Sequence, residues 1–361
     1  MRRRLRPSGL LALVAVLAAS PGLAATAETP AKAKPAPKPA AAKTAPKPPS
    51  LPPAALAPRL LGPSGAAAAT TLQGATLSPA PGEAEEGGDP VYSAYQRGLW
   101  LRAMALAIPR AEAGDAAAMT MIGTLYEGGL GVAVDLAKAA RWYGLAADRG
   151  DREATAALAQ MHVEGRGVAK DRKRAWTLFA AAAEKDQPIA LFNGAMLLFE
   201  GRDAPHDPER AARWLARAAE LGNIEAQYAY ASVLADEANP RRDPAAAAKW
   251  MREAAMAGFE AAEIEFALML INGRGIRRNP EDALVWFRRS ALRGNPIGRN
   301  RLARMLVAGI GTDPDPVEAM KWHILAERQG LPDVWLATRF AALSDDERRR
   351  ATEAADRLLD A

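Results

Sequence analysis

The sequence predicts an all-α protein, a right-handed α/α solenoid (superhelix) of six 36-residue helix-pair repeats with terminal capping helices. The main observation is a helix-length pattern that recurs every 36 residues, with a second helix-length pattern upstream in each copy. Asp135 can cap such a helix and Gly150 can end it. Between them, Trp142 and Tyr143 fall on one helical face. A helix pair cannot bury its apolar face alone, so neighbouring pairs must stack.

The second helix of each copy has the same start and the same end. An Asp or Asn stands at the start, where its side chain can accept a hydrogen bond from a free backbone N–H. This cap column is Asp135, Asp171, Asp207, Asp243, Asn279 and Asp315. The end is a glycine in every copy except the second. This stop column is Gly150, Asp186, Gly222, Gly258, Gly294 and Gly330.

Small and large residues also recur with this period. The first helix carries small residues, such as Ala118 and Gly123, which let two helix backbones approach closely. The second helix carries a large apolar residue, which we expect to fill the gap between the two helices. This tryptophan column is Trp142, Leu178, Trp214, Trp250, Trp286 and Trp322.

A glycine pair, Gly129 and Gly131 in the first copy, permits a tight turn between the helices. The fourth copy has Glu-Ala-Asn-Pro at 237–240 instead, so we expect a remodelled turn there.

Taken together, these residues resemble the Sel-1-like repeat family, a relative of the tetratricopeptide repeat, over about residues 89–331. The first copy matches the family pattern at Ala118, Gly123, Tyr126, Gly129, Gly131, Val132, Asp135, Lys138, Ala139, Trp142, Tyr143, Ala146, Ala147 and Gly150. The resemblance implies a helical-repeat fold and an adaptor role with protein partners.

The N-terminus predicts export. Residues 1–27 combine a basic start, a short apolar run from Leu10 to Ala19, and small residues suited to cleavage after Ala24 or Ala27. The run is too short to span a bilayer comfortably. We therefore expect a cleaved signal peptide and a periplasmic protein, with an uncleaved anchor as the alternative.

The rest of the chain divides into four parts. Residues 28–88 lack Phe, Trp and Tyr and are rich in Ala, Pro and Lys, which predicts a disordered linker. Residues 89–114 predict a degenerate N-terminal helix pair, residues 115–330 the six repeats, and residues 331–361 the C-terminal capping helices.

The C-terminal part should cover the open face of the last repeat. Leu336 and Phe340 are among the apolar residues that can pack there. Ser344 and Glu347 have the spacing of a capping box, which predicts the start of a final helix.

Charge and composition exclude several classes of protein. The formal net charge is +5, but Arg2, Arg3, Arg4 and Arg6 supply most of it, and the repeats are close to neutral. No basic field therefore indicates nucleic-acid binding. The chain has no cysteine, which excludes disulfides, thiol chemistry and a lipoprotein anchor.

No catalytic or metal-binding constellation emerges. His162 and His323 occupy apolar columns and should pack, and His206 lies in a loop, so we expect no metal site. The Asp column is explained by helix capping. The glycine turns lack the residues of a phosphate-binding loop. We therefore predict a non-enzyme without catalytic residues or cofactors.

One face of the first helices is the candidate binding site. Apolar residues share a helical side in the third to fifth copies: Phe192, Met196, Phe199, Tyr228, Ile264 and Leu268. They either pack between repeats or line a groove that takes a partner helix or extended peptide. In the sixth copy, Arg301 and Arg304 could form a rim for acidic groups.

These features predict an exported, non-catalytic adaptor for protein–protein interactions in the bacterial cell envelope. We expect one or more protein partners, no nucleic acid, and no membrane span after cleavage. The resemblance implies a role in envelope assembly or in polysaccharide export or its regulation. The alternative is a protein that binds or acts on peptidoglycan, with contacts to peptidoglycan or polysaccharide.

Overall fold

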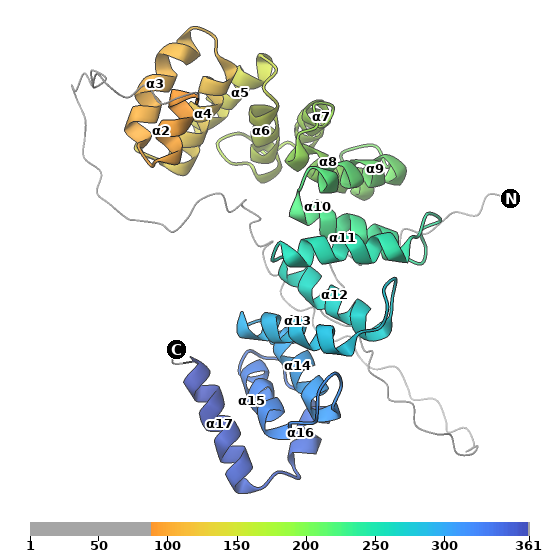
Figure 1. Cartoon of the computed structure of the whole chain (residues 1–361). Coiled ribbons are helices and arrows are strands. Elements are labelled where there is room, and N and C mark those ends of the chain that lie inside the picture. Colours follow the sequence, from red (N-terminus) through yellow and green to blue (C-terminus); the bar gives the residue numbers. More distant parts are fainter. Residues whose placement is uncertain (1–87, 360–361) are drawn as a thin grey trace, which may run out of the picture. The chain divides into compact units, whose positions relative to one another are not determined.

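The computed structural model describes residues 88–359, and every regular element in that range is a helix (Figure 1). The predicted signal peptide and almost all of the predicted linker lie outside the described residues. With the labels of Figure 1, the helices are α2 (Pro90–Gln96), α3 (Trp100–Glu112), α4 (Ala116–Gly128), α5 (Leu136–Asp148), α6 (Arg152–Glu164), α7 (Arg172–Ala183), α8 (Pro188–Glu200), α9 (Pro208–Glu220), α10 (Ile224–Ala235), α11 (Pro244–Met256), α12 (Glu260–Asn272), α13 (Pro280–Leu292), α14 (Pro296–Ala308), α15 (Pro316–Glu327), α16 (Val334–Phe340) and α17 (Asp345–Leu359).

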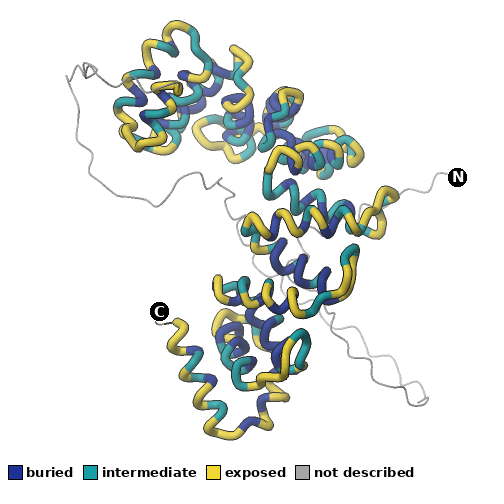
Figure 2. The backbone as a smooth tube through the Cα atoms, in the orientation of Figure 1, coloured by how far each residue is buried: buried dark blue, intermediate teal, exposed yellow. Residues whose placement is uncertain are grey.

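Each helix packs mainly against its neighbours in sequence. The pairs α4–α5, α6–α7, α8–α9, α10–α11, α12–α13 and α14–α15 form repeats 1 to 6, each with a first and a second helix. Buried residues lie on the sides of the helices that face other helices (Figure 2). The predicted all-α solenoid of six helix pairs is therefore confirmed. None of the helices within residues 88–359 is long and apolar enough to cross a bilayer.

The predicted caps start the second helices. Asp135 accepts a hydrogen bond from the backbone N–H of Lys138, and Asp171 does so from Arg174 (2.9 Å each). The other four predicted caps make equivalent bonds. Such bonds satisfy backbone donors that have no partner inside the helix.

The stop column ends the repeats with a left-handed backbone conformation. Asp186 has a φ of 54° and is the one non-glycine residue with positive φ among residues 88–359. The conformation costs a side-chain-bearing residue energy. Its carboxylate also accepts hydrogen bonds from Arg217 of repeat 3 (2.9 and 2.7 Å), which ties two repeats together.

The space between the paired helices is filled mainly by the residue that follows the tryptophan column. The fractional exposures in this buried column are Tyr143 3%, Phe179 0%, Leu215 1%, Met251 3%, Phe287 0% and His323 5%. Trp142, Trp214, Trp250 and Trp286 are only half-buried, although Leu178 and Trp322 are buried. A Cβ on Gly123 would lie 2.6 Å from the Tyr143 ring, so the small column makes room for Tyr143.

The prediction that the tryptophan column fills the gap is therefore correct only in part. Trp214, Trp250 and Trp286 contact the first helix of their own repeat, at Gly194, Tyr230 and Phe266 respectively, but their side chains stay half-buried. One residue along a helix turns the side chain by about 100°, and that rotation points the following residue more fully into the interface.

The fourth turn is remodelled, as expected. Helix α10 ends at Ala235, and Asp236 is extended rather than left-handed. The side chains of Asp236 and Asn239 then accept hydrogen bonds from the backbone N–H groups of Ala238 and Arg241 (2.9 Å each). Side-chain hydrogen bonds replace the glycine geometry of the other turns.

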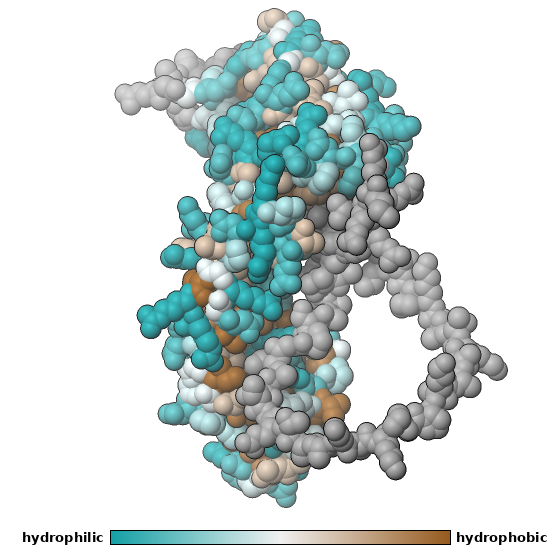
Figure 3. Space-filling model, turned by 90° about the vertical axis from the view of Figure 1, so that its right-hand side faces the viewer, coloured by the Kyte–Doolittle hydropathy of each residue, from teal (hydrophilic) through white to brown (hydrophobic). Residues whose placement is uncertain are grey.

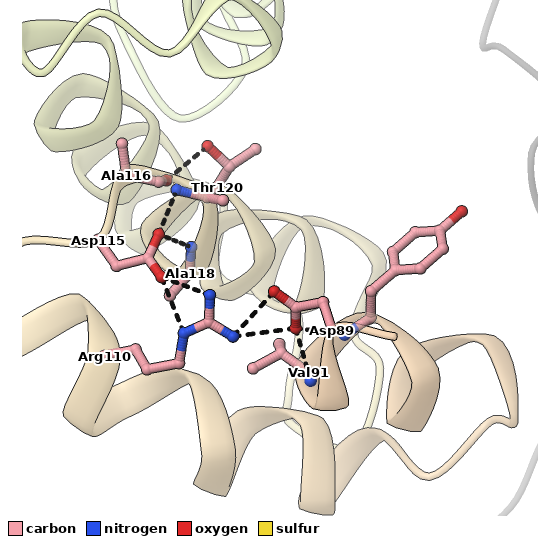
Figure 4. Close-up of polar contacts among 9 residues, drawn as sticks. Asp89, Val91, Arg110, Asp115, Ala116, Ala118 and Thr120 are labelled. Carbon is pink, nitrogen blue, oxygen red and sulfur yellow. Dashed lines mark hydrogen bonds and ion pairs between the residues drawn. The ribbon is translucent and has the colours of Figure 1, made fainter. Parts of the chain in front are cut away.

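Hydrogen bonds from one arginine side chain join the helices at the N-terminal end. Asp89 caps α2 and Asp115 caps α4. Arg110 on α3 donates to both carboxylates, at 2.9 Å to Asp89 and 2.8 Å to Asp115 (Figure 4). One guanidinium thus fixes the starts of two helices.

The C-terminal part covers the last repeat. Leu336 is fully buried, and Phe340 is 5% exposed. Glu347 accepts a hydrogen bond from the N–H of Ser344 (2.9 Å), and Ser344 Oγ accepts one from the N–H of Glu347 (3.3 Å). The predicted capping box is therefore present, and α17 packs on α15.

Candidate functional site

The predicted binding face lies on α8, α10 and α12. Most of its residues are half-buried, so part of each side chain reaches the surface: Phe192, Met196, Phe199, Tyr228 and Leu268. Ile264 is different, because it is 8% exposed and packs among the repeats. Figure 3 shows one side of the molecule, on which apolar side chains reach the surface among hydrophilic ones. The packing interpretation fits Ile264. Four of the others, Phe192, Phe199, Tyr228 and Leu268, also pack against the core, and like Met196 they keep part of their surface exposed.

An aromatic pair that the sequence analysis did not identify extends this face. The Tyr228 ring lies 5.0 Å from the Phe259 ring, with an interplanar angle of 47°. Phe259 stands at the N-cap position of α12 and makes no side-chain cap bond. The equivalent residues Asp115, Asp151, Gln187, Asn223 and Asn295 all cap their helices. The sequence signal for this pair is Phe259, an aromatic residue at a position that is a polar helix cap in the other repeats.

The position of Tyr228 is polar in the first and last repeats, where it holds Thr120 and Asn300. It is a buried alanine, Ala156, in repeat 2 and a large residue in repeats 3 to 5. Burial raises the pKa of the Tyr228 hydroxyl, so this residue presents a neutral ring with a polar tip at neutral pH. Such a side chain can contact both apolar and polar parts of a partner.

A carboxylate flanks the apolar face. Glu265 follows Ile264 on α12 and is half-buried. Burial raises its pKa, while the charges of Arg274 and Arg301 act in the opposite direction. The face is therefore apolar with charge at its edge.

Arg304, predicted to lie on a rim for a partner's acidic groups, pairs with the chain's own C-terminal part. Its Nε and Nη2 donate to Asp333 (2.6 and 3.0 Å), and its guanidinium lies 5.0 Å from the Trp335 ring. Asn300 also donates to Asp333 (2.7 Å). The charge of Arg304 is compensated within the chain, and α16 is held on α14. Binding of a partner by Arg301 and Arg304 stays a prediction.

The one fully buried carboxylate among the described residues has a structural role. Glu263 on α12 is 0% exposed and pairs with Arg289 on α13 (3.0 Å) and with Arg293, the residue that follows α13 (2.8 Å). Burial raises its pKa, and the two arginines act in the opposite direction. A paired charge of this kind joins two helices of one repeat.

The histidines are dispersed among different repeats. His323 is 5% exposed and its ring lies 5.4 Å from that of Phe340, which fits the packing role predicted for it. His162 Nδ1 lies 3.2 Å from the carbonyl oxygen of Ala169. Within residues 88–359, no three His, Cys, Asp or Glu residues are grouped so that they could hold a metal ion.

Comparison with protein families identifies the repeat. Six consecutive segments match the family described as Sel1 repeat, and together they cover more than half of the chain. The matched residues are 116–151, 152–187, 188–223, 224–259, 261–295 and 296–331. No curated protein sequence matches the chain.

One solved structure shows the same fold, and a second is less similar. A Sel1 repeat protein from Oxalobacter formigenes is 26% identical, with a TM-score of 0.57 over 65% of this chain and 94% of that one. The protective antigen c5321 from uropathogenic Escherichia coli, described as displaying an SLR fold, is 23% identical with a TM-score of 0.48. That match covers 72% of this chain and 64% of the antigen.

Proposed function

Because the chain belongs to the Sel1 repeat family, whose members generally mediate protein–protein interactions, we propose that it is an exported, non-catalytic adaptor of the bacterial cell envelope. It holds one or more partner proteins in the periplasm. Its role lies in envelope assembly or in polysaccharide export or its regulation.

The observation that supports partner binding is the half-buried apolar face on α8, α10 and α12. Interior positions of the repeats carry buried Ala, Leu or Phe, whereas Tyr228 and Met196 leave apolar surface in contact with water. Apolar surface that is contiguous and exposed can mark an interaction site. An apolar helix face or an extended peptide with apolar side chains is the matching partner.

Binding is tested with Tyr228→Ser and a matched control, Val285→Ser. Val285 is 64% exposed on the second helix α13, away from the proposed face. We expect Tyr228→Ser to weaken capture of a specific envelope protein by at least about tenfold, since aromatic anchors tend to dominate interfaces. Val285→Ser should bind normally, and thermal melting should show both variants folded. Equal capture by both variants, or a loss of binding fully explained by lower stability, contradicts the proposal.

Export is tested separately by sequencing the N-terminus of the protein isolated from its host. We expect it to begin near residue 25 or 28, after Ala24 or Ala27. An intact Met1 in the membrane fraction contradicts cleavage. Sedimentation with purified peptidoglycan distinguishes the adaptor from the alternative, a peptidoglycan-binding protein.

A further inference from the structure

The six repeats are not joined alike, and we propose that the stack opens first at the junction between repeats 3 and 4. Two kinds of contact that link other repeats are missing there. The inference depends only on contacts within the stack and is independent of the proposed function.

The first contact is a side chain that reaches the carbonyl of the preceding stop residue. Three such bonds each span 35 residues: Lys185 to Gly150 (2.6 Å), Arg293 to Gly258 (3.4 Å) and Gln329 to Gly294 (3.0 Å). Between repeats 2 and 3, Arg217 pairs with Asp186 instead. Between repeats 3 and 4 the equivalent residue is Ala257, which cannot donate. A Cβ on Gly222 would have no atom within 4 Å, so the stop residue of repeat 3 lies open.

The second contact is the close approach of a turn to the preceding repeat. The second glycine of the turn has no Cβ, so its backbone lies directly against a carbonyl of the helix before: Gly167 against Leu136, Gly275 against Pro244 and Gly311 against Pro280. In repeat 3 the equivalent residue is Asp203, which pairs with Arg172 of repeat 2 (2.9 Å). In repeat 4 it is Asn239, whose amide donates to Val233 of its own repeat (2.8 Å).

The buried core, by contrast, continues across this junction. One cluster of buried apolar side chains extends from α9 into α10 as far as Ala229, and the second cluster begins at Ala231, inside repeat 4. Tyr230 and Trp250, both partly buried, pack against the two clusters.

Few polar contacts replace what is missing. Among the described residues, the side-chain polar contacts across this junction are Gln227 to the carbonyl of Ala219 and Arg241 to Glu209, both at 3.4 Å. This distance is near the outer limit of a hydrogen bond, as is the distance from Arg293 to Gly258 at the next junction. The Arg241–Glu209 pair is also 69% and 66% exposed, where water and salt screen it. Helices α9 and α10 pack against each other as the corresponding helices at the other junctions do, so the difference lies in the hydrogen bonds and turn contacts that are missing here.

In a stack whose repeats touch only their neighbours, stability is the sum of repeat and interface contributions. The least stable interface therefore opens first. Repeats 1–3 and repeats 4–6 should open as two separate units, with the boundary between α9 and α10.

Urea-dependent hydrogen exchange of the full chain tests this division. We expect backbone amides of repeats 1–3 and of repeats 4–6 to fall into two groups with different urea dependence. Ala257→Lys places an amine where Lys185 stands two repeats earlier, and Ala257→Gln imitates Gln329. Either variant should slow the opening of the less protected group about fivefold, the effect of one added hydrogen bond.

Met256→Lys is the matched control. Met256 is 55% exposed and precedes Ala257, so the variant adds the same charge in a different direction. This variant should leave the hydrogen exchange of both groups of amides unchanged. The proposal is contradicted if hydrogen exchange in all six repeats has one urea dependence, or if the boundary between the two groups lies at another junction. It is also contradicted if Met256→Lys and Ala257→Lys have equal effects.

Discussion

Two positions of the helix pairs differ in how freely their residues vary. One position of the second helices is alanine in all six repeats and 0% exposed in each: Ala139, Ala175, Ala211, Ala247, Ala283 and Ala319. The position of Tyr228 on the first helices holds Thr120, Ala156, Phe192, Ile264 and Asn300 in the other repeats. Ala156, Ile264 and Asn300 are buried, whereas the residues in the other three repeats are half-buried. Close helix spacing restricts the first position to alanine, whereas the second position accepts side chains of different size and polarity.

Loss of an interior side chain should have the largest effect on stability. Phe287 is 0% exposed, and Phe287→Ala should lower the free energy of unfolding by about 3–5 kcal/mol because it opens a cavity. Urea melts measure this. Val285→Ala, two residues away and 64% exposed, should stay within about 0.5 kcal/mol. Similar losses for both variants would contradict the assignment of the buried column.

Two glycine substitutions compare a junction that has the close turn contact with the junction that lacks it. Gly275→Ala and Gly222→Ala each place a side chain in a left-handed conformation, at a cost of about 1–2 kcal/mol. Gly275→Ala should cost about 1–3 kcal/mol more, because its Cβ meets the carbonyl of Pro244. Gly222→Ala meets nothing within 4 Å. If the two variants melt alike, the close approach at Gly275 is not a stabilising contact.

A cap substitution should have a smaller effect. Asp171→Ala removes the acceptor for the N–H of Arg174 and should cost about 1 kcal/mol. Asp171→Asn keeps an acceptor and should recover most of that loss in the same thermal melts. No difference between the two would indicate that the cap column has another role.

The smallest effect is a pH dependence at the C-terminal end. Burial alone would raise the pKa of Asp333, but hydrogen bonds from Arg304 and Asn300 hold it below its ordinary value. The folded protein therefore binds this proton more weakly than the unfolded chain does. The stability that Asp333 contributes is present above the unfolded pKa of about 3.9 and is lost as pH falls through the folded value.

Asp333→Asn should therefore lower the urea midpoint at pH 7 and narrow the difference between the midpoints at pH 7 and pH 3. Asp313→Asn, at an exposed loop position, is the control and should keep the wild-type difference. If Asp333→Asn keeps the wild-type difference between the two urea midpoints, Asp333 is not the cause of the pH dependence.

The parts of the fold that could be predicted from sequence are those set by local chemistry. Asp135 and its equivalents cap helices through a backbone donor three residues away, and the stop residues need only a left-handed backbone. Both signals lie within a few residues, and the period repeats them. The solenoid followed because no single helix pair can bury its own apolar face.

What could not be predicted depends on contacts between distant segments. Trp142 and Tyr143 are adjacent, and the period alone does not show which one faces the partner helix. The pairing of Arg304 with Asp333 joins the last repeat to a segment beyond the periodic region. The role of Phe259 beside Tyr228 appears only when the first helices of consecutive repeats lie together.

The constant length of the repeat also affects how the gene can change. Contacts between repeats, such as that of Lys185 with Gly150, join residues about one period apart. Recombination between equivalent points of two repeats removes or adds 36 residues, so the remaining residues keep this spacing. Even when the breakpoint lies inside a helix, the two joined halves bury the same face. Each position is then occupied by the residue from the equivalent position of the other repeat. A shift of one residue at such a breakpoint would turn the following face by about 100°. A single genetic event can therefore lengthen or shorten this protein by whole repeats while keeping its interior.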